Sequence, residues 1–431
     1  MLKLIVYIFL ELEEINMNRY KFEVIVLATD MFGYYWGRSF YEKYNKKIYT
    51  LGNFQSPYTK YSKLFKENRI VENLFDEDVF VDSIIQYAND IKAGDPEVEI
   101  ILIPVNDHFV RYVIQNEIEL SKHCLFNLPN EQLLEKLMLK ENFYKTVSDH
   151  GLAIPKTIFH PAQKPFNETF TSFPCIVKPS TAIGWKELDF NEYEKVYHCN
   201  NEEELKDTLE AIRKTSYNEK LIIQEFIEGD DTNLWDIVTY SNTEGHVQFI
   251  NMGQVLLQEP SENMVGNYTA VMSRYNKPFM EKIFNLLNDL GYSGFANFDM
   301  KLDPKDNQYK LFEVNLRTGR SSFSVEQMGE SLARNIVDDL IYNKENKEVH
   351  YMNEPNLFSY VPKYVLEKHV LNSALKEEIK QLIKHKKMNN PLVYSKDRSL
   401  KRSGFLALRS AKYILKYQDG TWNRSKNSKE K

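Results

Sequence analysis

The segment from residue 294 to residue 317 carries the pattern that most restricts how this chain can fold. Apolar and polar residues alternate on both sides of a turn-forming run at 303–307, and a period of two is typical of half-buried β-strands. We therefore expect a β-hairpin. If its turn centres near Asp306, Asp299 lies directly opposite Glu313 on the polar face.

Two carboxylates that face each other in this way call for a cation. Side chains directly opposite in a sheet are about 5 Å apart, and like charges at that distance are destabilising unless they are neutralised. Hard divalent cations prefer oxygen ligands, so Asp299, Glu313 and Asn315 form a predicted magnesium site, which Mn²⁺ would also fit. Arg317, on the same face, can bind phosphate or carboxylate through two nitrogens. A metal ion and an arginine at one site together indicate phosphoryl transfer. The alternative is a hairpin whose charged face is merely exposed to water.

Length and composition indicate a folded, multidomain protein of the reducing cytoplasm. The chain has 431 residues, of which 42% are hydrophobic, and it can bury two or three cores. Its three cysteines are too widely spaced for a disulfide framework or a zinc site. The apolar run near the N-terminus is too short to span a membrane and lacks a signal-peptide cleavage pattern. We expect residues 1–16 to be an extension that precedes the first domain.

Alternating strands and helices predict a Rossmann-like domain with a parallel sheet over residues 17–120. Its buried-strand runs are 22–28 and 98–104, and each is followed by an aspartate at the sheet edge where open α/β sheets bind ligands. Helix capping is the alternative role for these aspartates. The candidate substrate-binding residues are Asp30, Arg38, Asp107 and Arg320. The first turn has no GxGxxG pattern, which argues against a dehydrogenase.

Three further segments carry polar groups in an apolar setting. A long helix is predicted from Glu131 to His150, with Gly151 ending it. The run 173–179 is a short buried strand that carries a single lysine, and a buried ammonium group needs a partner. The run 221–231 is an apolar strand that leads into an acidic turn, and its edge can offer backbone groups to an adenine ring.

These segments, in this order, resemble the ATP-grasp fold, in which the nucleotide lies between two α+β subdomains. The resemblance implies an α/β chain with the N-terminal Rossmann-like domain followed by an ATP-grasp domain at 121–345. A mostly helical, basic C-terminal region is expected at 346–431.

The resemblance also implies an ATP site and assigns its residues. The ATP-binding residues are expected to be Lys140, Lys178, Gln224, Glu225, Ile227 and Asp231. The two lysines hold the phosphates, the residues at 224–227 form the adenine hinge, and Asp231 binds the ribose. The three magnesium ligands are those named above, and Arg317 is the catalytic arginine that stabilises the acyl phosphate. Lys136, one helical turn before Lys140, is the alternative first lysine.

Several segments are similar to the D-aspartate ligase family of carboxylate–amine ligases, namely LATDMFGYYWGRSFYEKY, LIPVNDHFVRYV, IIQEFIEGDDTN and GNYTAVM. In that family, ATP phosphorylates the β-carboxylate of D-aspartate, and the lysine amine of a peptidoglycan precursor then attacks it. The resemblance implies the same substrates here. Two alternatives stay open: a ligase that makes a small soluble product from amino acids, and an ATP-binding module without ligase activity.

The charge is unevenly distributed along the chain. From Lys380 to the end there are fifteen Lys or Arg residues and three acidic residues, although the whole chain has a net charge of -6. The cationic apolar stretch at 405–416 raises the prospect of a weak contact with a membrane surface. We favour the alternative, a helix that packs on the core and has a solvated cationic face. No motif supports nucleic-acid binding.

Overall fold

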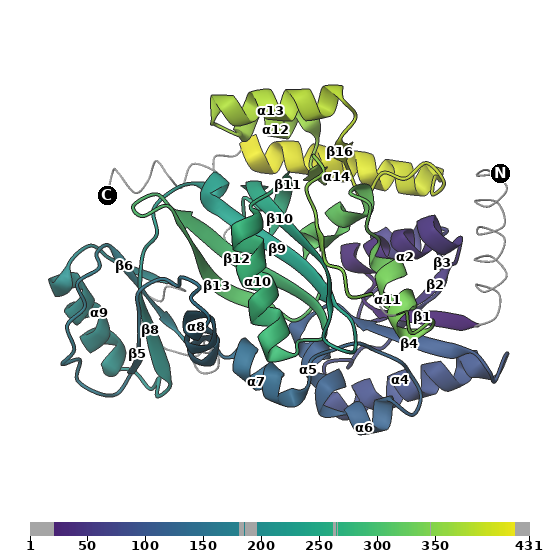
Figure 1. Cartoon of the computed structure of the whole chain (residues 1–431), viewed down its shortest axis with the longest axis horizontal. Coiled ribbons are helices and arrows are strands. Elements are labelled where there is room, and N and C mark those ends of the chain that lie inside the picture. Colours follow the sequence, from purple (N-terminus) through teal and green to yellow (C-terminus); the bar gives the residue numbers. More distant parts are fainter. Residues whose placement is uncertain are drawn as a thin grey trace. The chain divides into compact units, whose positions relative to one another are not determined.

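The computed structural model describes residues 21–180, 185, 196–261, 264, 266–344 and 346–418 (Figure 1). The predicted extension at residues 1–16 lies outside this part of the chain. Two compact units are present. The first unit comprises Met1–Leu134, Asp236–Asn297 and Asn315–Lys431, and the second comprises Glu135–Trp235 and Phe298–Val314.

The first unit begins with a four-stranded parallel sheet. In spatial order its strands are β3 (Phe65–Ile70), β2 (Ile48–Gly52), β1 (Phe22–Leu27) and β4 (Glu99–Pro104). The accompanying helices are α2 (Met31–Tyr44), α3 (Pro57–Lys60), α4 (Glu77–Lys92), α5 (Asp107–Gln115) and α6 (Glu117–Leu120). The central strand β1 is fully buried over residues 24–27, as expected for a parallel sheet covered on both faces. The predicted parallel-sheet domain is confirmed.

A larger sheet contains the predicted hairpin. Its strands, in spatial order, are β13 (Gln308–Asn315), β12 (Gly294–Asp303), β9 (Leu234–Ser241), β10 (Val247–Gln258), β11 (Tyr268–Arg274), β15 (Leu357–Ser359) and β16 (Met388–Asn389), and β14 (His350–Tyr351) pairs with β10. The helices of this region are α10 (Lys277–Leu290), η3 (Arg320–Gln327) and α11 (Leu332–Leu340). Because β12 and β13 are neighbours joined by a short turn, the hairpin is confirmed.

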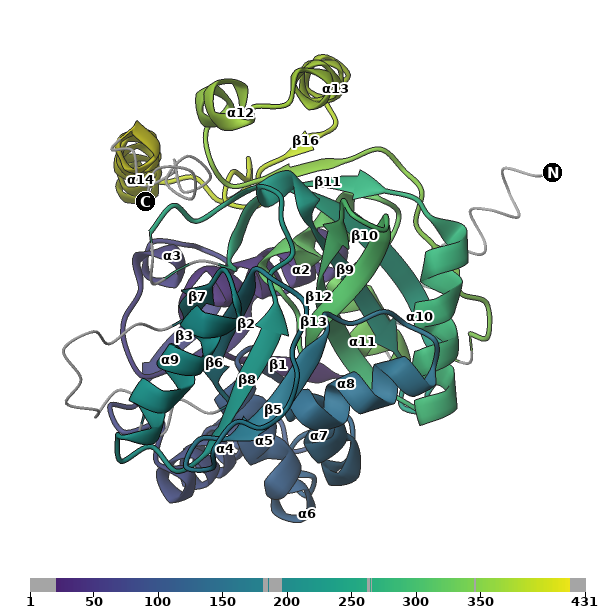
Figure 2. The same cartoon turned by 90° about the vertical axis from the view of Figure 1, so that its left-hand side faces the viewer.

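The second unit holds a separate antiparallel sheet (Figure 2). In spatial order its strands are β5 (Thr157–Pro161), β8 (Lys220–Glu225), β6 (Cys175–Pro179) and β7 (Tyr197–Cys199). Val177 and Ile223 on one face join the apolar side of α9 (Glu202–Arg213) in a buried core. Since side chains alternate across a strand, Lys178 and Gln224 project from the opposite face.

The single helix predicted from Glu131 to His150 is wrong. The structure has two helices, α7 (Glu131–Met138) and α8 (Lys140–Asp149), separated by Leu139 in an extended conformation. Each helix buries its own apolar stripe, so the apolar periodicity continues through the break and conceals it. Gly151, which follows α8, has a φ of +69° and ends the helix as predicted.

The C-terminal region is mostly helical, as expected. Its helices are α12 (Lys363–His369), α13 (Ser373–Lys384) and α14 (Leu400–Gln418). Within the described part of the chain, no helix is long and apolar enough to cross a membrane.

A buried ion pair attaches the start of α14 to the parallel-sheet domain. Arg402 Nε lies 3.0 Å from Asp397 Oδ2, and both side chains are 1% exposed. Asp397 also accepts hydrogen bonds from the Lys63 N–H and the Ser62 hydroxyl, each at 2.8 Å. Removing one member of such a pair leaves the other as an uncompensated buried charge.

We expect Asp397→Ala to lower the free energy of unfolding by about 3 kcal/mol, because it leaves the Arg402 guanidinium buried without its counterion. Urea unfolding followed by circular dichroism measures the change. Replacing both residues, Asp397→Leu with Arg402→Met, should recover part of the loss. The exposed neighbour Arg398→Ala is the control, and an equal loss in that variant would contradict the assignment.

Candidate active site

Two lysines from different elements of the second unit are electrostatically coupled to one carboxylate. Lys140 opens α8 and places its Nζ 3.2 Å from Glu313 Oε2. The pKa of Lys178 is lowered to about 7, mainly because burial disfavours the ammonium form and also because Lys140 adds a like charge, while Glu313 acts in the opposite direction. Two predicted phosphate ligands and a predicted metal ligand therefore lie within one electrostatic cluster.

The position of Lys178 is fixed by its strand and by a buried glutamine. On β6 it pairs in register with Ile222 of β8, on the face opposite the α9 core. Its Nζ donates to Gln224 Oε1 at 3.1 Å. The Gln224 amide nitrogen donates in turn to the Tyr144 hydroxyl and to Thr157 Oγ1, at 2.8 and 2.9 Å. Gln224 is therefore the polar partner that the ammonium group of Lys178 needs in this apolar strand.

The break at Leu139 bears on the choice between the two candidate first lysines. Lys136 lies on α7 and is exposed, whereas Lys140 lies on α8. The two therefore do not share one helical face as predicted. The ion pair with Glu313 favours Lys140.

A side-chain hydrogen bond joins the two strands at the end of the hairpin. Asn315 Nδ2 donates to the carbonyl of Asn297 at 3.3 Å, as expected if these residues lie opposite each other. Gly319 is required close by, because a Cβ atom at that position would lie 1.8 Å from Asn297 Oδ1. Asp299 and Glu313, on the same two strands, are each half-buried.

The donor set of this hairpin suits magnesium. Among the described residues, no group of three or more His, Cys, Asp or Glu side chains could hold a metal ion. The predicted site differs from such a group because it combines two carboxylates with the amide oxygen of Asn315. Magnesium is commonly held by one or two carboxylates and completes its octahedron with phosphate oxygens and water, so these residues fit the ion.

Two lysines that the sequence analysis overlooked hold the predicted adenine hinge. Lys301 donates to the carbonyls of Ile227 and Gly229, at 2.8 and 3.1 Å. Lys310 is buried, and its Nζ lies 2.7 Å from Glu225 Oε1 and 2.6 Å from Asp303 Oδ2. The sequence could have indicated a buried role for Lys310, because this lysine shares a strand face with apolar residues, as Lys178 does.

The hinge keeps one donor available. The N–H of Ile227 makes no hydrogen bond to another described residue, although the neighbouring N–H groups of Glu225 and Phe226 are paired with Lys156 and Pro174. Asp231 begins the short helix η1 (Asp231–Asn233), which directly follows the hinge. A backbone donor beside a buried apolar residue is what recognition of an adenine edge requires.

Arg317 and Asp107, both predicted site residues, form an ion pair in the first unit. Arg317 Nε lies 2.9 Å from Asp107 Oδ1, and its Nη2 lies 3.1 Å from Oδ2. The same Nη2 donates to Asn315 Oδ1 at 3.0 Å. Asp107 at the start of α5 therefore orients the arginine, and the arginine orients the amide of a predicted metal ligand.

The remaining candidates for substrate binding differ from one another. Arg38 is buried and donates to Glu42 and to the carbonyls of Asn390, Pro391 and Val393, so the fold occupies its guanidinium and we assign it a structural role. Asp30 caps α2 by accepting from the Phe32 N–H at 2.9 Å, which is the alternative raised from the sequence. Burial raises the pKa of Asp30, and Arg320 opposes the shift.

Arg320 keeps unused hydrogen-bonding capacity. It donates to the Tyr360 hydroxyl at 2.9 Å and lies 3.5 Å from the buried carboxylate of Glu259. Its Nε is buried and has no hydrogen-bond partner within the described residues. Arg320 therefore remains a candidate for binding a substrate carboxylate.

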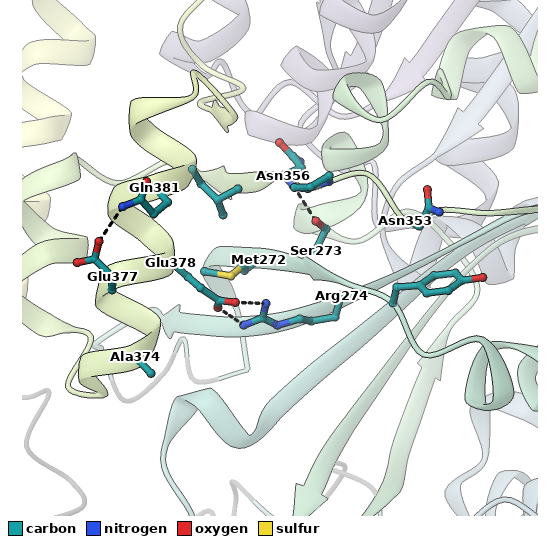
Figure 3. Close-up of a pocket in the computed structure, with 12 residues that line it drawn as sticks. Met272, Ser273, Arg274, Asn353, Asn356, Ala374, Glu377, Glu378 and Gln381 are labelled. Atoms are coloured by element: carbon teal, nitrogen blue, oxygen red, sulfur yellow. Dashed lines mark hydrogen bonds and ion pairs between the residues drawn. The ribbon is translucent and has the colours of Figure 1, made fainter.

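A cavity of about 670 Å³ lies elsewhere in the first unit, between β11 and α13 (Figure 3). Several of its polar groups are already paired: Arg274 binds Glu378 through both terminal nitrogens, and Ser273 is hydrogen-bonded to Asn356. None of the predicted site residues lines it. We therefore do not place the nucleotide or substrate site in this cavity.

Comparisons with known proteins identify the fold and the family. The family model of the carbamoyl-phosphate synthase L chain ATP-binding domain matches residues 162–333. Two solved structures share the fold. The first is an L-amino acid ligase from Bacillus licheniformis, with 14% identity, a TM-score of 0.50 and 75% of each chain covered. The second is the biotin carboxylase domain of Hydrogenobacter thermophilus 2-oxoglutarate carboxylase with MgADP, ADP and bicarbonate, with 13% identity, a TM-score of 0.55, and 78% of this chain and 73% of that chain covered.

The curated relative is more informative, because its similarity extends along nearly the whole chain. The D-aspartate ligase of Enterococcus faecium (strain Aus0004) is 32% identical over 413 residues, which cover 94% of this chain and 97% of the relative. The match includes the parallel-sheet domain as well as the ATP-binding region. With this relationship and the shared fold, the chain belongs to the D-aspartate ligase family of ATP-grasp carboxylate–amine ligases.

Proposed function

We propose that this enzyme uses MgATP to phosphorylate the side-chain carboxylate of D-aspartate and joins the product to the lysine amine of a peptidoglycan precursor in the cytoplasm. The observation that carries the ATP chemistry is the ion pair of Lys140 with Glu313, together with a buried Lys178 that is electrostatically coupled to both groups. The D-aspartate ligase relative supports the choice of acid and amine.

The reaction needs an activated acid, because hydroxide is a very poor leaving group for an attacking amine. Transfer of the γ-phosphoryl group forms an acyl phosphate and ADP, and attack by the amine then expels inorganic phosphate. Lys140 and Lys178 would neutralise charge on the transferred phosphoryl group. Bound between Asp299, Glu313 and Asn315, magnesium would supply further positive charge to the phosphates.

We assign the acyl group to Arg317. Its guanidinium, oriented by Asp107, would stabilise the oxyanion that develops when the amine attacks. Arg320, with an unused Nε, is the candidate for the α-carboxylate of the amino acid, and Asp30 is the candidate for its ammonium group.

An ADP-release assay with a panel of acids and amines tests the substrates. D-aspartate with a lysine-containing muropeptide should give the fastest turnover, and mass spectrometry should find the amide product. Faster turnover with a free amino acid as acceptor would instead identify a ligase that makes a small product. ATP binding without ADP release across the panel would indicate a binding module.

We expect Glu313→Gln and Asp299→Asn each to abolish amine-dependent ADP release, because each removes a charged ligand of the magnesium site. Circular dichroism should show that both variants are folded. Glu117→Gln, at an exposed position on α6, is the matched control and should keep full activity. Turnover at the wild-type rate in either site variant would refute the metal assignment.

Binding of ATP should take up a proton at pH 8. In the free protein the pKa of Lys178 is about 7, so the amine is mostly neutral at pH 8, and the negative phosphates of ATP favour its charged form. Calorimetric titrations in two buffers of different ionisation enthalpy should show an uptake that approaches about one proton per ATP, and this uptake should vanish at pH 6, where the lysine is already charged.

The control for this measurement is a side chain that stays charged. Lys178→Arg should bind ATP without proton uptake at pH 8, because arginine is protonated throughout this range. Lys136→Arg, on the exposed side of α7, should leave the uptake unchanged. Undiminished uptake in Lys178→Arg would show that another group takes up the proton.

Asp107→Asn should lower kcat about tenfold with little change in KM for ATP, because the amide can no longer hold Arg317 by a charged, two-point contact. Steady-state kinetics with varied ATP and acid measures the split. Asp78→Asn is the control, since Asp78 is also an acid in the first turn of a helix but is exposed and far from Arg317 in the sequence. An equal effect of the two substitutions would contradict the positioning role.

A further inference from the structure

Helix α14 turns its arginines inward and its leucines outward. Arg402 and Arg409 are 1% and 8% exposed, whereas Leu400, Leu408 and Leu415 are 94%, 75% and 58% exposed. The favoured expectation of a packed helix with a solvated cationic face is therefore only half right. The helix is packed, but much of its solvent-facing side is apolar.

The buried arginines are firmly held, so this orientation is specific. Arg409 donates to the Tyr58 hydroxyl at 2.7 Å and to the carbonyl of Tyr360 at 2.8 Å. Arg402 donates to the carbonyls of Tyr58 and Leu392 and pairs with Asp397. Rotating the helix to bury the leucines would leave two guanidinium groups without these partners.

The three leucines form one stripe. At about 100° per residue, positions 400, 408 and 415 lie within about 80° of one another around the helix axis, and the two arginines lie on the opposite side. The helix α12 contacts α14 (Figures 1 and 2) and also carries exposed apolar residues, with Tyr364 48% exposed and Leu371, just beyond the helix, 61% exposed. An exposed apolar stripe such as that of α14 marks an interaction site.

Cations lie beside this stripe and just before it in the chain. Lys396, Arg398, Lys401 and Lys412 are all exposed on α14 or immediately before it. The only acidic residue between positions 380 and 418 is Asp397, and the ion pair with Arg402 buries it. The charge that this segment presents to solvent is therefore entirely positive.

We propose that α14 docks this enzyme on an anionic lipid surface, with its leucines inserted at the headgroup boundary and its lysines facing the lipid phosphates. A cationic helix with a leucine stripe has the chemistry of an interfacial helix, and two weak signals together give stable binding. A second copy of the chain would bring like charges together at this face, which disfavours self-association. Nucleic acid would use the cations but leave the leucines exposed to water.

Vesicle sedimentation with the full-length protein tests the proposal. The protein should bind vesicles of phosphatidylcholine with about one-third phosphatidylglycerol, and it should not bind pure phosphatidylcholine. Added salt should weaken the binding, because screening removes the electrostatic contribution. The variant with Leu400, Leu408 and Leu415 all changed to serine should bind about tenfold less tightly or worse. Lys401→Glu with Lys412→Glu should bind less tightly as well.

Matched controls separate docking from damage to the fold. All three leucines are exposed, so the triple variant should unfold at the wild-type temperature. Ile118→Ser removes an 84% exposed apolar residue on α6 and should bind vesicles like the wild type. Failure of the wild type to bind anionic vesicles would overturn the proposal, and so would undiminished binding by the triple variant. Loss of a concentration-dependent dimer in the triple variant, measured by light scattering, would identify a second copy as the occupant and would also overturn it.

Discussion

The charge balance around Glu313 is the interaction on which the rest of the site depends. One carboxylate faces Lys140 at 3.2 Å and opposes the loss of charge on Lys178. Without it, less negative charge would offset two lysines that share a partly buried space, and burying like charges together is unfavourable. A polyphosphate would bring the missing negative charge, and a magnesium ion would then offset the excess. The cluster is therefore suited to a ligand of high negative charge.

A second connection runs from the parallel-sheet domain to the end of the hairpin. The carboxylate of Asp107 holds Arg317, which in turn donates to Asn315. The domain that precedes the ATP-grasp region thereby fixes a residue expected to act on the acyl group. This contact gives a physical reason for the similarity to the D-aspartate ligase relative to extend over 94% of the chain and not over the nucleotide-binding region alone.

The features that depend on local periodicity could be predicted from the sequence. The hairpin was visible because apolar residues alternate around a turn, and the parallel strands were visible as continuous apolar runs. The break at Leu139 could not be predicted, because the apolar stripe continues across it. Lys301 was overlooked because its partner Ile227 is far away in the sequence, whereas the apolar neighbours of Lys310 on its strand could have indicated that its ammonium group needs a buried partner.

Long-range packing also decides which charges face inward. The arginines of α14 look like solvent-exposed residues in the sequence, yet they are held by Tyr58, Tyr360 and Leu392. Arg38 is a similar case, since the carbonyls that occupy it come from residues more than 350 positions later. Three carbonyl acceptors can satisfy a guanidinium group as fully as a substrate can, and the sequence alone cannot distinguish the two.

The lowered pKa of Lys178 has a chemical consequence for an enzyme that makes an acyl phosphate. A neutral lysine amine is a nucleophile, and an acyl phosphate beside it could acylate the enzyme in place of the substrate amine. Protonation removes the lone pair that such an attack needs. In the proposed reaction, the ATP that creates the electrophile would also charge Lys178 and so protect the enzyme from acylating itself.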